Sequence, residues 1–131
     1  RIKKRMGERF LIDTNAASDY LGGRLPVAGL QFMDTIVNDA PIISIINRIE
    51  LLGHNRTEIE KFKILVAACI VVELTESVIL KTIAIRKSRR IKIPDAIIAA
   101  TALVYDLTLI THNLSDFEGI SGLKIMDAHS L

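Results

Sequence analysis

Cysteine is nearly absent from this 131-residue sequence, which contains one, Cys69. A single cysteine cannot form an internal disulfide or build a thiolate metal cluster. Because Cys69 lies in the apolar run 66–72, we expect it to be a small buried hydrophobic residue. Histidine clusters are missing as well, so the sequence does not predict a structural zinc site.

Long hydrophobic runs are also missing. Half of the residues are hydrophobic, yet charges interrupt every apolar run well before the roughly 20 residues of a membrane-spanning helix. No apolar signal-peptide core follows the basic residues 1–5, which we interpret as a leader or a non-native remnant. We expect residues 6–131 to form one domain of a cytoplasmic protein that has no membrane partner.

Positive charge is concentrated in one segment, although the net charge is only +2. Five cations stand within seven positions, and we call them the basic cluster: Arg86, Lys87, Arg89, Arg90 and Lys92. Such a patch favours a polyanionic partner and predicts contacts with an RNA backbone. The alternative interpretation is a solvated helix end, where the helix dipole favours Lys and Arg.

Short apolar runs alternate with longer runs of helical spacing, which predicts a three-layer α/β/α fold around a mostly parallel sheet. We expect strands at 9–12, 41–44, 70–73, 108–111 and, more weakly, 124–126. Helices are predicted after Asn15 up to Gly22, and at 26–38, 45–52, 75–90 and 94–105. A further helix should begin at Thr57, because Thr57 and Glu60 form a capping-box pattern.

Two acids follow predicted strands. Asp13 ends the first strand, and Asp116 lies shortly after the fourth, with Asn113 in the same loop. Because parallel strands bring their carboxyl ends to one edge, where open α/β sheets bind ligands, these groups could face one another. The alternatives are that Asp13 only caps a helix and that the loop only forms turns.

Two more acids stand among apolar neighbours in predicted helices. Glu50 borders a stripe formed by Ile45, Ile49 and Leu52, so we expect it to be half-buried, with a cation or Arg48 as its partner. Asp95 opens the most apolar helix, where a favourable interaction with the helix dipole is the alternative explanation.

Four acids at one edge would repel one another unless a cation lies between them. Carboxylate oxygens suit hard divalent ions, and Mg²⁺ is commonly held by a few carboxylates together with water and substrate phosphate. Such a site can activate water and polarise a phosphoryl oxygen. The sequence therefore predicts metal-dependent hydrolysis of a phosphodiester.

Four segments in order resemble the PIN domain, most closely the VapC-type toxins of toxin–antitoxin pairs, over residues 8 to 127. The segments are 10–15, Ser44 with Glu50 and Leu51, 93–102, and 109–117. The resemblance implies an α/β/α sandwich and an endoribonuclease that depends on Mg²⁺ or Mn²⁺.

The resemblance also implies roles for individual residues. Asp13 and Asp95 would bind metal directly, and Glu50 and Asp116 would bind a second metal or act through water. Thr14, Asn15, Thr111 and Asn113 would orient carboxylates or water. His112 stands where an Arg is frequent, which puts a phosphate contact in doubt. Expected partners are RNA, a cognate antitoxin and a second copy of the chain.

Two alternatives stay open at this point. One is a PIN-like module that binds RNA or protein without cutting; the presence of all four acids disfavours it. The other is a receiver-like domain phosphorylated on Asp13. Receiver domains use an acidic pair near the first strand and a late Lys, and the predicted strand 108–111 does not lead directly into a Lys.

Overall fold

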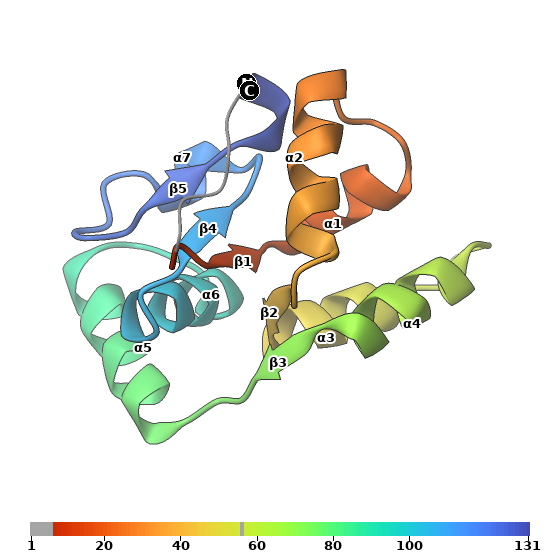
Figure 1. Ribbon diagram of the computed structural model, residues 1–131. Coiled ribbons are helices and arrows are strands. Elements are labelled where there is room, and N and C mark those ends of the chain that lie inside the picture. Colours follow the sequence, from red (N-terminus) through yellow and green to blue (C-terminus); the bar gives the residue numbers. More distant parts are fainter. Residues whose placement is uncertain (1–6, 56) are drawn as a thin grey trace.

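The structure, a computed structural model, describes residues 7–55 and 57–131 (Figure 1). At its centre is a five-stranded sheet in which all paired strands are parallel. The strands lie within the predicted apolar runs: β1 Phe10–Ile12, β2 Ile42–Ser44, β3 Ile70–Val72, β4 Thr108–Ile110 and β5 Ile125–Met126. The expected leader, residues 1–5, lies outside the described residues.

The strand order is β3-β2-β1-β4-β5. The chain builds outward from β1 to β3 and then crosses back over β1 to form β4 on the other side. Because crossovers between parallel strands are right-handed, this reversal places the connecting helices on opposite faces of the sheet. Receiver domains have the order 2-1-3-4-5, so the receiver-like alternative is wrong.

The first face of the sheet is covered by four helices and a short 3-10 helix. Apolar side chains of β1, β2 and β4 form a core with these helices, in which the Phe10 and Phe32 rings meet edge to face at 5.3 Å. The covering elements are α1 Thr14–Leu21, α2 Val27–Val37, α3 Ile45–Leu52, α4 Ile59–Ala68 and η1 Ala128–Ser130.

The second face packs against α5 Glu76–Ser88, α6 Ile93–Val104 and α7 Leu114–Phe117. Residues 96–102 of α6 are all buried, and four of these seven are alanines, so the helix can lie close to the sheet. The three-layer α/β/α fold predicted from the sequence is therefore confirmed. Among the helices of residues 7–55 and 57–131, none is long and apolar enough to cross a membrane.

The start of α4 differs from its prediction. The helix begins at Ile59 rather than Thr57, and its first residue follows Glu58, which makes no side-chain capping bond. Glu60 pairs with Lys63 instead of reaching back to Thr57. Ile59 packs against the core of the first face. Tertiary packing, rather than the capping-box pattern, therefore sets the start of this helix.

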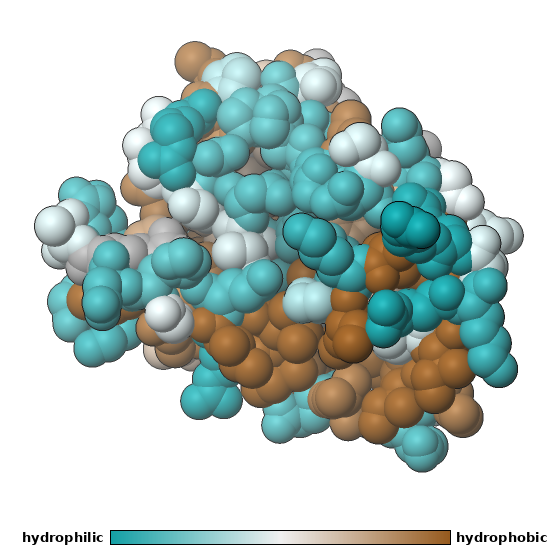
Figure 2. All heavy atoms as spheres, turned by 180° about the vertical axis from the view of Figure 1, so that it is seen from behind, coloured by the Kyte–Doolittle hydropathy of each residue, from teal (hydrophilic) through white to brown (hydrophobic). Residues whose placement is uncertain are grey.

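Apolar residues also lie outside the core, on β3 and α5. Ile70 on the edge strand β3 is 52% exposed, so β3 is not covered on both faces as its apolar run predicted. The helix α5 is apolar on two sides: Val78 and Ile85 are buried, while Ile79, Leu80 and Ile83 are not. We call these last three residues the outer face of α5. Figure 2 shows apolar side chains gathered along the lower part of the molecule seen from behind.

Cys69, which follows α4, is half-buried rather than fully buried. Even partial burial raises the pKa of its thiol to about 11. At neutral pH the side chain is therefore a neutral thiol, as expected for a packing residue.

Gly29 allows α2 to approach η1 closely. A Cβ at this position would lie 1.9 Å from the Ala128 carbonyl oxygen. We expect Gly29→Ala to lower the free energy of unfolding by about 1–3 kcal/mol through overpacking, measured by denaturant titration. Gly22→Ala is the matched control, because its Cβ meets only the flexible Arg24 side chain. Equal stability of the two variants would contradict this account.

Candidate active site

Asp13 lies where the sheet reverses, at the carboxyl end of β1 and beside the end of β4. Its backbone N–H donates to the Ile110 carbonyl oxygen at 2.9 Å and extends the β1–β4 ladder. Its side chain accepts from the Thr14 N–H at 2.9 Å and caps α1. Asp13 therefore caps a helix and also stands at the edge where open α/β sheets bind ligands.

The Asp13 carboxylate is 5% exposed and accepts four hydrogen bonds. Oδ1 accepts from the Thr14 N–H and, at 3.3 Å, from Asn47 Nδ2. Oδ2 accepts from Thr111 Oγ1 at 2.8 Å and from Asn15 Nδ2 at 3.1 Å. These bonds use the roughly four lone-pair positions of a carboxylate, so groups from α1, α3 and the end of β4 fix its orientation.

Burial raises the pKa of the Asp13 carboxyl above its ordinary value of 3.8, against the lowering effect of hydrogen bonds from Thr111 and Thr14. The charges of Glu50 and Asp95 raise this pKa further. The folded protein therefore favours the protonated acid. The stability that this raised pKa contributes to the folded protein is fully present below the ordinary Asp13 pKa. It is lost as the pH rises through the raised pKa of the folded state. The ionised form of Asp13 is therefore less favourable here than in water, and a nearby cation would relieve that cost.

The buried face of α3 is not the predicted one. Ile49, a member of the expected apolar stripe, is 61% exposed, whereas Asn47 and Leu51 are fully buried. Asn47 turns inward because its side chain bonds the Ser44 N–H at 2.9 Å as well as the polar groups beside β1. Glu50 is half-buried as expected, although the stripe used to place it was wrong.

Glu50 is linked to Asp13 through Thr14. The Thr14 hydroxyl donates to Glu50 Oε1 at 2.6 Å, and the same hydroxyl accepts from Asn47 Nδ2 at 3.1 Å. Asn47 thus contacts both Thr14 and Asp13. Arg48, the alternative partner of Glu50, forms no ion pair with it within the described part of the chain.

Asp95 occupies the first turn of α6 and is half-buried. Desolvation raises the pKa of its carboxyl, and the negative charges of Asp116 and Glu50 raise it further, while Lys92 lowers it. These effects place Asp95 within electrostatic range of two other candidate acids.

Asp116 and Asn113 lie in and before α7, in the segment that follows β4. Asn113 Nδ2 donates to Asp116 Oδ2 at 2.5 Å. The Asn113 N–H donates to Thr111 Oγ1 at 3.0 Å, and Thr111 is the residue that also holds Asp13. The segment after β4 therefore orients both acids: Asn113 bonds Asp116, and Thr111 bonds Asp13.

The fold brings Asp13, Glu50 and Asp116, from three separate elements, into electrostatic range of Asp95, and Glu50 also acts on Asp13. Among residues 7–55 and 57–131, however, no three Asp, Glu, His or Cys side chains form a ready-made metal cluster. Like charges favour separated side chains, so convergence on a cation would need side-chain movements. Chemically, the arrangement offers oxygen ligands of the kind that Mg²⁺ and Mn²⁺ accept.

All residues of the basic cluster except Lys87 line one hollow of about 510 Å³, together with two of the acids. Arg86, Arg90 and Lys92 surround it together with Asp95 and Asp116. Positive side chains therefore stand beside the candidate metal ligands, where they could bind the phosphates of a substrate.

Arg89 differs from the rest of the basic cluster. Its guanidinium donates to the Glu118 carbonyl oxygen at 2.8 Å and to the Asp116 carbonyl oxygen at 3.3 Å. It therefore fixes the end of α7 against α5, which leaves fewer of its N–H groups for the RNA contact predicted from the sequence.

His112 belongs to a polar group that sequence reasoning missed. Its Nδ1 lies 2.9 Å from Asp127 Oδ2, and its ring stacks on His129 at 4.0 Å. His129 Nε2 in turn lies 2.8 Å from Asp19 Oδ2. The sequence held one signal for this group, because Asp127 directly follows the predicted last strand.

Asn47 is the other residue of the site that the sequence analysis missed. It is an uncharged residue in a predominantly apolar helix, so neither charge nor hydrophobic pattern marks it. The one signal is its position three residues after Ser44, which is typical of a capping box.

Comparisons with known proteins give consistent results. A family model described as PIN domain matches residues 10–123. No curated protein sequence matches the chain. The fold is similar to that of a toxin–antitoxin complex from Klebsiella pneumoniae, with 27% identity, a TM-score of 0.72, and coverage of 91% of this chain and 97% of that one.

Two further structures are similar. VapBC-1 from nontypeable Haemophilus influenzae has 27% identity and a TM-score of 0.72, and 91% of this chain and 97% of that one are covered. DNA-bound VapBC from Salmonella typhimurium has 23% identity and a TM-score of 0.75, with coverage of 92% and 98%. At 23% identity, the similarity to the Salmonella typhimurium structure shows a shared fold only.

The Thr111 hydroxyl is expected to hold the pKa of Asp13 down, because it donates to the ionised carboxylate. Thr111→Val should therefore raise the pKa of Asp13, measured by NMR titration of the metal-free protein. Thr108→Val is the control, since Thr108 lies at the other end of the same strand. An unchanged or lower Asp13 pKa in Thr111→Val would refute the role of this bond.

Proposed function

Because this chain belongs to the PIN domain family, we propose that it is a metal-dependent endoribonuclease that hydrolyses phosphodiester bonds in RNA. The observation that carries the proposal is the buried Asp13 carboxylate at the reversal point of the sheet. Its pKa is raised by desolvation and then by the charges of Glu50 and Asp95. A site of this kind favours a divalent cation, which in turn would attract an anionic substrate.

The donor chemistry supports Mg²⁺ or Mn²⁺ as the cofactor. We assign Asp13 and Asp95 as direct ligands, and Glu50 and Asp116 to a second ion or to contacts through water. Because Asp13 already accepts four hydrogen bonds, ligation requires one to open, and the longest comes from Asn47 at 3.3 Å. When bound, such an ion polarises the phosphoryl oxygen and lowers the pKa of water.

Neighbouring residues orient the acids. Thr14 holds Glu50, Asn113 holds Asp116, and Thr111 with Asn15 holds Asp13. Because each carboxylate is already held in one orientation, less conformational entropy is lost when a cation and a substrate bind.

RNA is proposed to enter along the basic cluster. Arg86, Arg90 and Lys92 share a hollow with Asp95 and Asp116, so a phosphate that they bind lies beside the acids. Arg89 and Lys87 belong to the same cluster, with Arg89 acting mainly through its bonds to α7.

The biological role we propose is that of the toxin of a type II toxin–antitoxin system, acting in the cytoplasm and neutralised by a cognate antitoxin. The similar structures from Klebsiella pneumoniae and Haemophilus influenzae, a toxin–antitoxin complex and VapBC-1, support this role.

A homodimer is proposed through the outer face of α5. Ile79, Leu80 and Ile83 lie on one side of the helix because their spacing is close to one turn. They are 37%, 60% and 46% exposed, an unusual concentration of large apolar side chains for a free surface.

We expect Leu80→Glu to convert a dimer into a monomer, measured by light scattering after size exclusion, because a charge cannot be buried unpaired in an apolar interface. Val27→Glu is the control, since Val27 is 72% exposed on the distant α2. A Leu80→Glu protein that stays dimeric would exclude this interface.

The catalytic proposal predicts that Asp13→Asn and Asp95→Asn each reduce RNA cleavage by about 10³-fold or more, because a bound ion supplies several kcal/mol of transition-state stabilisation. Cleavage of a fluorescent RNA in Mn²⁺ measures the effect. Asp106→Asn is the matched control: Asp106 is exposed at the opposite end of β4.

Circular dichroism and calorimetric titration accompany the assay. Native folding of both inactive variants, with weakened Mn²⁺ binding, would support the assignment. Full activity in either variant would refute it. A wild-type protein that binds no Mn²⁺ would favour the alternative of an inactive PIN-like binding module.

A further inference from the structure

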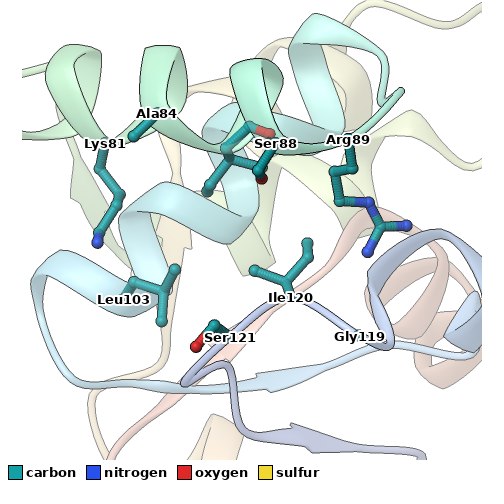
Figure 3. A pocket seen from close by; sticks show the side chains of 9 residues that line it. Lys81, Ala84, Ser88, Arg89, Leu103, Gly119, Ile120 and Ser121 are labelled. Carbon is teal, nitrogen blue, oxygen red and sulfur yellow. Dashed lines mark hydrogen bonds between the residues drawn. The ribbon is translucent and has the colours of Figure 1, made fainter.

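A second hollow, of about 420 Å³, opens between α5, α6 and the segment that joins α7 to β5 (Figure 3). Its volume lies in the range of known small-ligand pockets. Figure 3 shows Lys81 and Arg89 at its two ends, with Leu103 and Ile120 between them and Ser121 on the facing segment. No residue of its lining is acidic.

The chemistry of this hollow is cationic at the ends and apolar in the middle. Lys81 is exposed, and neither Lys81 nor Ser121 makes a side-chain hydrogen bond or ion pair within residues 7–55 and 57–131. Leu103 and Ile120 are partly or fully buried and belong to the core of the second face. A ligand with an anionic group and a flat apolar body would complement both parts.

Arg89 joins this hollow to the candidate active site. It lines the 420 Å³ hollow and also the 510 Å³ hollow that contains Asp95 and Asp116. Its bonds to the Asp116 and Glu118 carbonyl oxygens hold it in place as the shared wall. A polyanion that leaves the active site past Arg89 therefore reaches Lys81 next.

We propose that the hollow lined by Lys81, Leu103, Ile120 and Ser121 is a subsite for one nucleotide of a single-stranded RNA, beyond the bond to be cleaved. Lys81 binds a phosphate, the base lies on Leu103 and Ile120, and Ser121 bonds a base edge. The inference rests on the proposed ribonuclease function. Recognition of unstacked bases beside a cationic path is the usual mode for single-stranded RNA.

The observations favour RNA over an acidic peptide as the occupant. The hollow adjoins the basic cluster, so the same polyanion can use both sites. Two cations separated by an apolar floor match the alternation of phosphate and base along one strand.

The test is fluorescence anisotropy with a labelled single-stranded RNA of mixed sequence, in EDTA so that no cleavage occurs. Lys81→Ala should weaken binding and reduce the slope of log affinity against log salt by about 0.7, the value of one phosphate contact. Ser121→Glu should weaken binding by about tenfold or more, because it places a like charge beside the phosphate.

Two control variants make the result specific. Lys63→Ala removes the same charge from α4, on the other face of the sheet, and should leave the slope unchanged. Arg90→Ala, in the basic cluster, should weaken binding if the proposed active site receives RNA at all. Both positions are exposed, so neither change should disturb folding.

The possible results distinguish a failure of the nucleotide subsite from a failure of the proposed ribonuclease function. Losses in Lys81→Ala and Ser121→Glu, but not in Lys63→Ala, would support the subsite. If only Arg90→Ala weakens binding, the subsite is refuted and the ribonuclease proposal survives. If the wild-type protein binds no RNA, both fail. If Ser121→Glu blocks antitoxin binding and leaves RNA affinity intact, the hollow takes a peptide instead.

Discussion

The hydrogen bond from Thr111 to Asp13 joins the carboxyl ends of β1 and β4, the two strands between which the sheet reverses its order. The reversal sends helices to both faces of the sheet and leaves these two strand ends side by side. The buried carboxylate of Asp13 accepts hydrogen bonds there from Thr111, Asn15, Asn47 and the Thr14 N–H, and those from Thr111 and Thr14 oppose the rise in its pKa that burial causes. The Thr111 bond that joins the ends of β1 and β4 is therefore also one of the bonds that orient the Asp13 carboxylate.

Charge is the second constraint on this edge of the sheet. Desolvation raises the pKa of both Asp13 and Asp95, and the neighbouring acids raise them further. Asp13, Glu50 and Asp116 lie in electrostatic range of Asp95, but among the described residues no three acids form a finished metal cluster. The basic cluster stands just outside, where it favours an anionic substrate without neutralising Asp13. Negative ligands inside and positive side chains at the rim suit the metal-assisted phosphodiester hydrolysis that we propose.

Apolar patterning predicted the layers, because each buried strand needs a continuous apolar run and each helix a periodic one. Strand ends then predicted where Asp13 and Asp116 would lie. Residues whose role depends on contacts distant in sequence were harder. Asn47 carries no charge and sits in an apolar helix, yet its bonds to Asp13 and Thr14 turn that face inward and leave Ile49 exposed. The start of α4 was misplaced because core packing of Ile59 outweighs a local capping pattern.

The most direct test of the central claim is to locate a bound ion by anomalous scattering from crystals of the wild-type protein grown with Mn²⁺. The account predicts a peak bonded to carboxylate oxygens of Asp13 and Asp95, with the Asn47 contact to Asp13 lengthened. A crystal in which Mn²⁺ binds elsewhere, while Asp13 keeps all of its hydrogen bonds, would contradict it.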